Sequence, residues 1–171
     1  RIRGPMNPAV ALRRGVVRRS WCVLALVAAA LPGCSPTVED PMGTLRRSDS
    51  LPISQQRAMT QLEDDSSPEY IALLRRIVIQ PGYTTPVRER AFQQLLAKDP
   101  KALRDALALA LPRMDALEWR TRLCELIAEN GMTDMTPTLI NALAVNMAGW
   151  IRDDEQRPEY IALQKLHGAS S

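Results

Sequence analysis

PVRERAFQQLLAKDPKALRDAL (residues 86–107) is the stretch that decides the fold, because it contains two short amphipathic periods separated by a proline. Apolar residues recur at helical spacing in both halves: Val87, Ala91 and Leu95, then Leu103 and Leu107. Between them, Asp99 precedes Pro100. This pair favours a helix start, because an acidic side chain can cap free amides and proline loses only an amide that is unpaired anyway. The stretch therefore predicts a helical hairpin.

Proline also marks expected helix starts elsewhere in the chain. Four further prolines precede apolar periods of helical spacing, at Ser67-Pro68, Thr85-Pro86, Thr136-Pro137 and Arg157-Pro158. Asp115 with Glu118 has the spacing of a capping box and predicts one more start. Strand patterns are absent, so we expect an all-α domain of about seven helices over residues 51–171. Short turns between them favour antiparallel hairpins.

A second hairpin, at residues 118–143, can be laid over the first with Arg120 on Arg88. The chain here resembles the HEAT-repeat family, which places an Arg early in the first helix, an Asp in the turn and leucines in the second helix. The resemblance implies that the hairpins stack as a short α-solenoid. We expect Arg88 and Arg120 to be structural repeat positions that bond the adjacent turns, with Asp99 and Asp134 as their acceptors.

A hexapeptide also occurs twice. PEYIAL stands at residues 68–73 and again at residues 158–163. Pro-Glu openings suit helix starts, because the acidic side chain interacts favourably with the positive end of the helix dipole. By the expected helix count, the two copies fall on non-equivalent arms of their hairpins, so they define no simple repeat.

The N-terminal part has a different pattern. Arginines at positions 13, 14, 18 and 19 precede an uncharged apolar run over residues 21–31, which ends in Leu31-Pro32-Gly33-Cys34. This order is typical of a secretory signal. The 11-residue run would form about 16 Å of helix, too short for the roughly 30 Å hydrocarbon core of a bilayer. We therefore expect cleavage of the segment.

Residues 31–34, LPGC, resemble the lipobox of bacterial lipoproteins, although Pro32 replaces the usual small residue. The resemblance implies a lipid on the Cys34 thiol, cleavage just before it, and the membrane as a partner. Ser35 follows the cysteine, which in this family favours the outer membrane if the cell is Gram-negative. The alternative is an ordinary cleaved leader in which Cys34 is incidental.

These patterns divide the chain into three parts. Residues 1–33 are expected to be upstream residues and a cleaved signal peptide, with Met6 as its start. Residues 34–50 are rich in Ser, Pro, Thr and charged side chains, so we expect a lipidated N-terminus followed by a flexible, disordered linker. Residues 51–171 are expected to form the HEAT-like all-α domain.

Charge argues against a nucleic-acid partner. Six of the 22 basic residues precede Cys34 and all 19 acidic residues follow it, so the part after the leader carries 16 basic and 19 acidic residues, a net charge of −3. The basic character of the whole chain belongs to its leader. Nucleic-acid binding therefore loses its main support.

The sequence predicts no catalytic, cofactor-binding or metal-binding residues. His167 is the only histidine, so neither a histidine metal cluster nor a histidine-paired nucleophile can form. Cys124 lies in an amphipathic helical period, where a free cysteine is expected to be a small buried hydrophobe. The acidic clusters at residues 63–65 and 153–155 lack the spacing of a calcium loop, and Trp119 and Trp150 are expected to pack.

The sequence thus favours an exported, membrane-anchored protein that acts as a non-catalytic protein-interaction or scaffold module for an unknown partner. One alternative is a small-ligand binder or enzyme that uses Glu, Asp and Arg without histidine. A second alternative is a purely structural envelope lipoprotein.

Overall fold

A computed structural model of the chain describes residues 37–147 and 157–168, which are all-helical with no strand. This part contains eight α-helices, and two 3₁₀ turns lie at Leu111–Arg113 and Thr133–Met135. The helices are α1 (Pro41–Arg46), α2 (Pro52–Gln61), α3 (Pro68–Ile79), α4 (Thr85–Lys98), α5 (Pro100–Ala110), α6 (Leu117–Glu129), α7 (Thr136–Met147) and α8 (Pro158–Gly168). The predicted all-α class is therefore confirmed.

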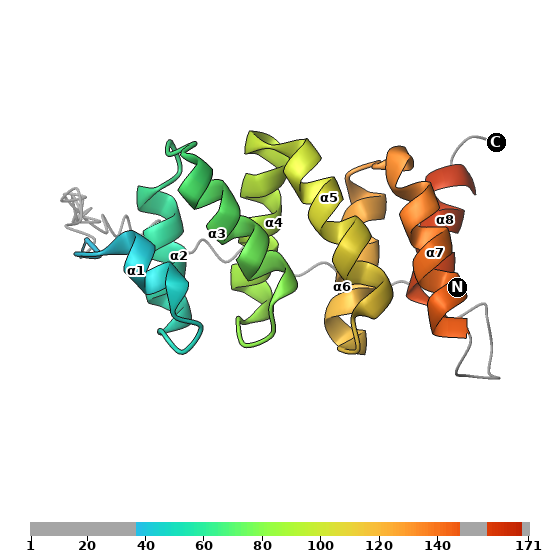
Figure 1. Ribbon diagram of the computed structural model, residues 1–171, viewed down its shortest axis with the longest axis horizontal. Coiled ribbons are helices and arrows are strands. Elements are labelled where there is room, and N and C mark those ends of the chain that lie inside the picture. Colours follow the sequence, from blue (N-terminus) through green and yellow to red (C-terminus); the bar gives the residue numbers. More distant parts are fainter. Residues whose placement is uncertain (1–36, 148–156, 169–171) are drawn as a thin grey trace, which may run out of the picture. The chain divides into compact units, whose positions relative to one another are not determined.

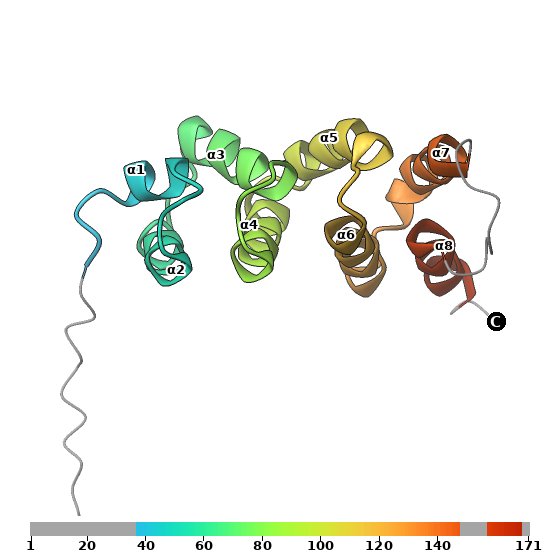
Figure 2. The same cartoon turned by 90° about the horizontal axis from the view of Figure 1, so that it is seen from below.

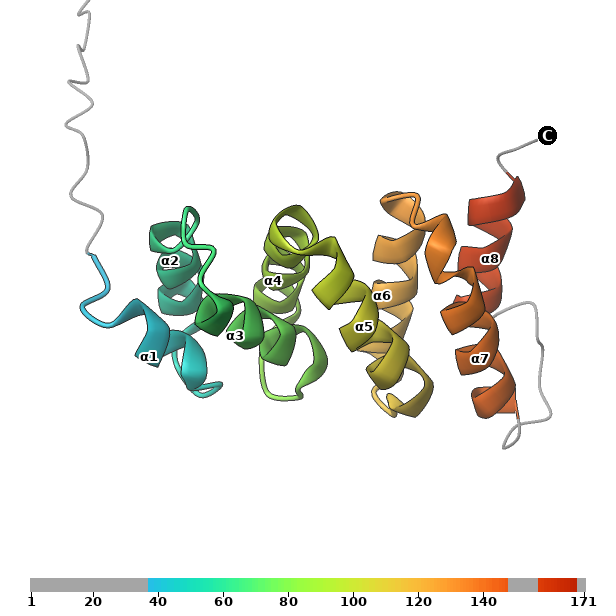
Figure 3. The same cartoon turned by 45° about the horizontal axis from the view of Figure 1, so that its top comes forward.

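The helices form two layers. Figure 2 shows α1, α3, α5 and α7 in one row and α2, α4, α6 and α8 in the other. Successive pairs follow one another along the rows, as Figure 1 and Figure 3 show from two other sides. The pairs α1 with α2, α3 with α4 and α7 with α8 pack closely, and α6 packs mainly against α8. This is a solenoid-like arrangement of helices that bury their apolar faces between the layers.

Several helix starts follow the expected chemistry. The Ser67 side chain accepts a hydrogen bond from the Tyr70 amide at the start of α3, and the Asp99 side chain accepts one from the Ala102 amide at the start of α5. Such caps satisfy amides that have no partner within the helix. The Ser-Pro and Asp-Pro pairs were therefore correctly interpreted as helix starts.

Two expected caps do not form. The residue before α4 is Thr84, one position earlier than expected, and its side chain makes no capping bond. The residue before α6 is Ala116, so the capping box predicted for Asp115 and Glu118 is wrong. The 3₁₀ turn that follows α5 places Asp115 outside the first turn of α6.

The turn between α3 and α4 requires a glycine. Gly82 has φ of 100°, a left-handed conformation that side chains with a Cβ rarely adopt. A Cβ built there would lie 3.2 Å from the Ser48 side chain. The preceding Pro81 cannot continue a helix, so α3 ends at Ile79. This turn forms one wall of the site described below.

The predicted apolar faces form one continuous core. On α4, the predicted face of Val87, Ala91 and Leu95 is buried, and on α6 Leu123, Leu126 and Ile127 are buried in the same way. Ile71 on α3 and Ala110 on α5 are only partly buried and pack against the core. The largest fully buried side chains are Tyr70, Phe92, Leu45, Met59, Leu74, Ile77, Leu95, Leu103, Leu107, Leu111, Leu123 and Ile127.

The linker expected over residues 34–50 is wrong in its second half. Residues 41–46 form α1, whose start is capped by the Asp40 side chain. Leu45 is 0% exposed, and its carbonyl accepts a hydrogen bond from the Tyr83 hydroxyl at 2.8 Å. Leu45, with the partly buried Val38 and Met42, therefore attaches this polar segment to the core. The seven other described α-helices lie after residue 51, in agreement with the expected number there, and α1 is additional to them.

The two PEYIAL copies bury opposite faces. In α3, Tyr70 and Leu73 are buried and Glu69 is exposed. In the copy on α8, Pro158, Glu159 and Ala162 are buried, while the counterparts of Tyr70 and Leu73 are only partly buried. The copies lie in different layers, as expected (Figure 2). Identical local sequence thus forms a helix twice but packs in two ways.

Across the ranges 37–147 and 157–168, no helix combines the length and apolar character needed to cross a bilayer.

Candidate functional site

A pocket of about 500 Å³ lies where the end of α3 and the start of α4 meet the segment that joins α5 to α6. We call it the Arg88 pocket. Its apolar lining consists of Ile79, Pro81, Leu109, Ala110, Met114 and Ala116. Its polar lining consists of Gln80, Arg88, Arg113 and Asp115. The volume lies in the roughly 300–1,000 Å³ range typical of small-molecule sites.

Local sequence builds both walls of this pocket. One wall follows α3, which ends before Pro81. The other wall follows α5, where Pro112 lies in a 3₁₀ turn and Met114 has extended backbone before α6 begins. Pro81 and Pro112 each prevent the preceding helix from continuing into the next one, so two helix ends lie at the pocket. The pocket is thus a consequence of two helix ends.

Arg88 is the most unusual residue of the site. Only 7% of it is exposed, yet none of the described carboxylates pairs with it. Its Nη2 donates to the Val78 carbonyl oxygen at 3.1 Å, and its Nε is buried without a hydrogen-bond partner. Burial lowers the pKa of Arg88 to about 10, so it remains a cation at neutral pH. The pocket therefore contains a buried positive charge.

Trp119 supports this charge from α6. The guanidinium carbon of Arg88 lies 4.3 Å from the centre of the Trp119 ring. The indole Nε1 donates to the same Val78 oxygen at 2.9 Å. A cation over an aromatic face is attracted by the negative face of the ring. The expectation that Trp119 packs in the core is confirmed, since it is only 3% exposed.

Arg120, the counterpart of Arg88 in the sequence of α6, supports the pocket wall. Arg120 donates from Nη1 to the Met114 carbonyl oxygen at 2.9 Å, and its Nε lies 3.1 Å from the Glu159 carboxylate. Glu159 is 1% exposed and also accepts from Asn146 at 3.0 Å. Arg88 bonds a carbonyl in the last turn of the preceding helix α3, and Arg120 bonds one in the segment just before α6. Their equivalence extends to a bond with a preceding carbonyl.

The expected acceptors of these arginines are wrong. Asp99 caps α5, and Asp134 pairs with Arg104 on α5. The aspartates lie in the turns after the arginine helices, whereas the arginines reach back to the turns before them. A sequence alignment of repeats identifies such positions but not the direction in which a long side chain extends.

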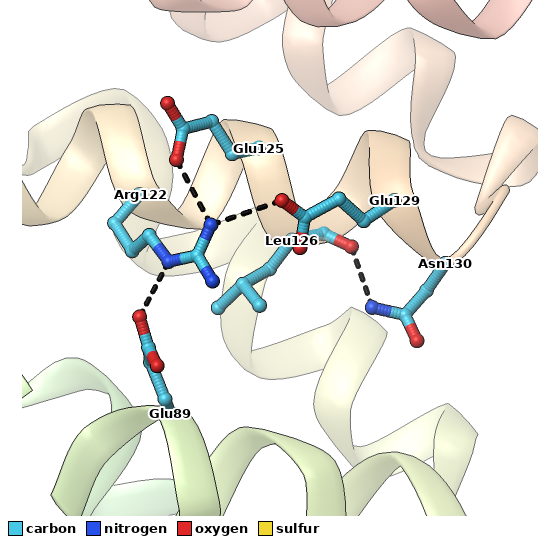
Figure 4. Close-up of polar contacts among 6 residues, drawn as sticks. All are labelled: Glu89, Arg122, Glu125, Leu126, Glu129 and Asn130. Atoms are coloured by element: carbon cyan, nitrogen blue, oxygen red, sulfur yellow. Dashed lines mark hydrogen bonds and ion pairs between the residues drawn. The ribbon is translucent and has the colours of Figure 1, made fainter. Parts of the chain in front are cut away.

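A second polar cluster links α4 to α6 on the surface. Figure 4 shows Arg122 between Glu89 on α4 and the pair Glu125 and Glu129 on its own helix. Its Nη1 lies 2.9 Å from Glu125 and 3.0 Å from Glu129. The hydrogen bonds that Arg122 donates, first to Glu89 and then to Glu125, raise the pKa of Arg122. This cluster is a fixed ionic bridge between neighbouring helices of one layer.

Cys124 and His167, the other two residues considered for chemistry, lie outside the Arg88 pocket. Cys124 is 1% exposed, as expected for a buried hydrophobe, and burial raises the pKa of its thiol. A neutral thiol is a poor nucleophile. His167 is exposed in the last turn of α8, where its Nε2 lies 3.0 Å from the Thr136 hydroxyl oxygen. Cys34, Trp150 and the acidic cluster at residues 153–155 lie outside the described residues.

Sequence reasoning identified Arg88 but missed the pocket and the buried Glu159. The pocket depends on two helix ends that are about thirty residues apart, and no local pattern relates them. Glu159 belongs to a Pro-Glu opening that normally marks an exposed first turn, and in the other copy Glu69 is exposed. Pro112, which shortly precedes the potential capping residue Asp115, was the available signal for the second helix end.

Within the part of the chain that the structure describes, no group of three or more His, Cys, Asp or Glu side chains is arranged to hold a metal ion. No known protein family, curated protein or solved structure matches this chain.

Proposed function

We propose that this chain is an exported protein, anchored to a membrane by a lipid on Cys34, whose helical domain acts as a non-catalytic protein-interaction or scaffold module. The support for the anchor is the LPGC sequence after a basic and then apolar leader. An anchor of this kind concentrates the domain at a membrane surface, which raises its effective concentration toward partners there.

One observation carries the interaction role: two apolar side chains are exposed beside a formed pocket. Leu109 is 67% exposed and Ile79 is 37% exposed, and both line the Arg88 pocket. Single exposed apolar residues are common, but apolar residues grouped around a concave site favour binding. Since the pocket walls rest on the buried core, the site is formed before a partner arrives.

The anchor is tested by membrane fractionation and labelling with a fatty-acid probe. Wild-type protein should be recovered with membranes and should carry the label. Cys34→Ser should be soluble or remain as uncut precursor. Equal labelling of the two proteins would contradict the lipid anchor but would leave the interaction role to be tested separately.

The interaction role is tested by a photo-crosslinking residue placed at position 109 in the anchored protein. Position 145 is the matched control, because Val145 is 50% exposed on α7 and does not line the pocket. A discrete crosslinked partner from position 109 and none from position 145 is the expected result. The same adducts from both positions, or none from position 109, would contradict a specific interaction at the pocket.

A further inference from the structure

The starting observation is a buried cation without a counter-charge. Arg88 has a buried Nε that makes no hydrogen bond, as do Arg104 and Arg120. Arg104 pairs with Asp134 and Arg120 with Glu159 through this same atom. Arg88 has no such pair among the described residues. Its charge is compensated only by one carbonyl oxygen and one aromatic ring.

This compensation is incomplete. A guanidinium has five N–H donors, and the Val78 carbonyl engages only Nη2. Nε is buried without a hydrogen bond, while Nη1 makes no hydrogen bond and is not among the buried atoms that lack one. Nη1 is therefore a nitrogen of Arg88 that is neither fully enclosed nor hydrogen-bonded, and Arg88 lines the pocket. A buried charge is costly unless it is paired, so this nitrogen favours an anionic partner.

The remaining lining limits the chemistry of that partner. Six of the ten lining residues are apolar, which suits a hydrocarbon body rather than a sugar or a nucleotide. Arg113 and Asp115, both exposed, also line the pocket and carry opposite charges. Together with Arg88 they leave one net positive charge. A ligand with a single negative charge matches it, whereas a second negative charge would face Asp115.

We propose that the Arg88 pocket binds a small monocarboxylic acid with an apolar body. Its carboxylate accepts hydrogen bonds from Arg88 Nη1, and its hydrocarbon part lies against Ile79, Leu109 and Met114. Arginine suits this role because its planar guanidinium matches the geometry of a carboxylate. This inference is independent of the lipid anchor and assigns a small-molecule ligand in addition to the protein partner proposed above.

The test is isothermal titration calorimetry of the purified full chain with octanoate, kept below its micelle concentration. 1-Octanol is the matched probe without charge, and acetate is the matched probe without the apolar body. Octanoate should bind with one site, and both controls should bind at least about tenfold more weakly, the change expected for losing a charged hydrogen bond or the apolar contact. Equal binding of octanol, or no binding of octanoate, would overturn the proposal.

Variants locate the binding. Leu109→Asp places a negative charge at the exposed rim without altering the core, and it should weaken octanoate binding by about tenfold or more. Val145→Asp on α7 is the control and should bind octanoate like the wild type. Arg88→Lys keeps the charge but loses the planar guanidinium, so it should bind more weakly while circular dichroism reports its folding. Unchanged binding in Leu109→Asp would place the ligand elsewhere and overturn the proposal.

A peptide with a free carboxyl terminus and apolar side chains shares the same chemistry. A tetrapeptide of leucines, acetylated at its N-terminus, is therefore titrated beside octanoate. Weaker binding of the peptide than of octanoate is expected. Tighter binding of the peptide, lost when its carboxyl group is amidated, would replace the small acid by a protein terminus as the ligand of this pocket.

Discussion

Arg88 and Trp119 share one acceptor. The Arg88 guanidinium donates to the Val78 carbonyl oxygen at 3.1 Å, and the Trp119 indole donates to the same oxygen at 2.9 Å. Val78 lies in the last turn of α3, where carbonyl groups have no partner within the helix. Two helices that follow later in the chain, α4 and α6, thus complete the end of α3.

Because Arg88 and Trp119 share this acceptor, we expect a variant that lacks both donors to lose more stability than the two single variants together. Trp119→Phe keeps a ring and should lower the free energy of unfolding by about 1–2 kcal/mol, because it removes one buried hydrogen bond. Arg88→Met leaves Val78 with the Trp119 donor. The double variant leaves the carbonyl with no donor, so its loss should exceed the sum of the single losses by about 1 kcal/mol.

Urea denaturation of the four proteins measures this coupling. Tyr83→Phe combined with Trp119→Phe is the control, because Tyr83 donates to a different carbonyl, that of Leu45. That pair should be additive. Strict additivity of the Arg88 and Trp119 changes would show that Val78 finds another donor, and the shared acceptor would then have no energetic importance.

Replacing glutamate by alanine should have a large effect on stability in one PEYIAL copy, at Glu159, and a small effect in the other, at Glu69. Glu159→Ala removes a buried carboxylate from Arg120 and should cost about 3 kcal/mol of unfolding free energy. Glu69→Ala removes only an exposed pair with Arg46 and should cost less than about 1 kcal/mol. Thermal or urea unfolding distinguishes the two. Similar costs would contradict the different helix faces assigned to the two copies.

Cys124 predicts a fall in stability at alkaline pH. Burial raises the thiol pKa in the folded state, so above the ordinary thiol pKa of about 8.5 the unfolded chain loses a proton that the folded chain keeps. This contribution is fully present below pH of about 8.5 and is lost as pH rises, at up to about 1.4 kcal/mol per pH unit.

The measurement compares wild type with Cys124→Ala between neutral pH and about pH 9.5, below the ordinary tyrosine pKa of about 10. The difference in unfolding free energy between the two proteins should shrink or reverse as pH rises. A constant difference would mean that the Cys124 thiol ionises equally in both states and would contradict its burial.

Leu45 predicts that α1 is a stable part of the fold. Leu45→Ala should lower the free energy of unfolding by about 2–4 kcal/mol, because it leaves a cavity in the core. The exposed Leu51 provides a matched control, since Leu51→Ala should change stability by less than about 0.5 kcal/mol. If the two variants were equally stable, residues 41–50 would be the flexible linker expected from composition.

Much of the fold could be predicted from local pattern, because most of its described helices have a proline in the first two positions and bury regular apolar faces. The faces around Ala91 and Leu123 needed only the helical period. The helix at residues 41–46 could not be predicted, because composition averages over many residues while a few apolar side chains, Leu45 foremost, attach a short helix to the core. The pocket could not be predicted, because it requires the distance between two helix ends.

The sequence by itself determined that the chain after residue 51 is helical, that prolines mark most of its helix starts, and that Arg88 and Arg120 occupy matching positions. These properties depend on contacts within a few residues of the chain. Only the tertiary structure decided which face of each PEYIAL helix is buried and which carbonyl each arginine reaches. Burial of Glu159 requires Arg120 and Asn146 from two other helices, and the charge of Arg88 lies in a pocket because α3, α4 and the α5–α6 segment meet there. Such surroundings depend on contacts between residues far apart in the sequence, so no local pattern encodes them.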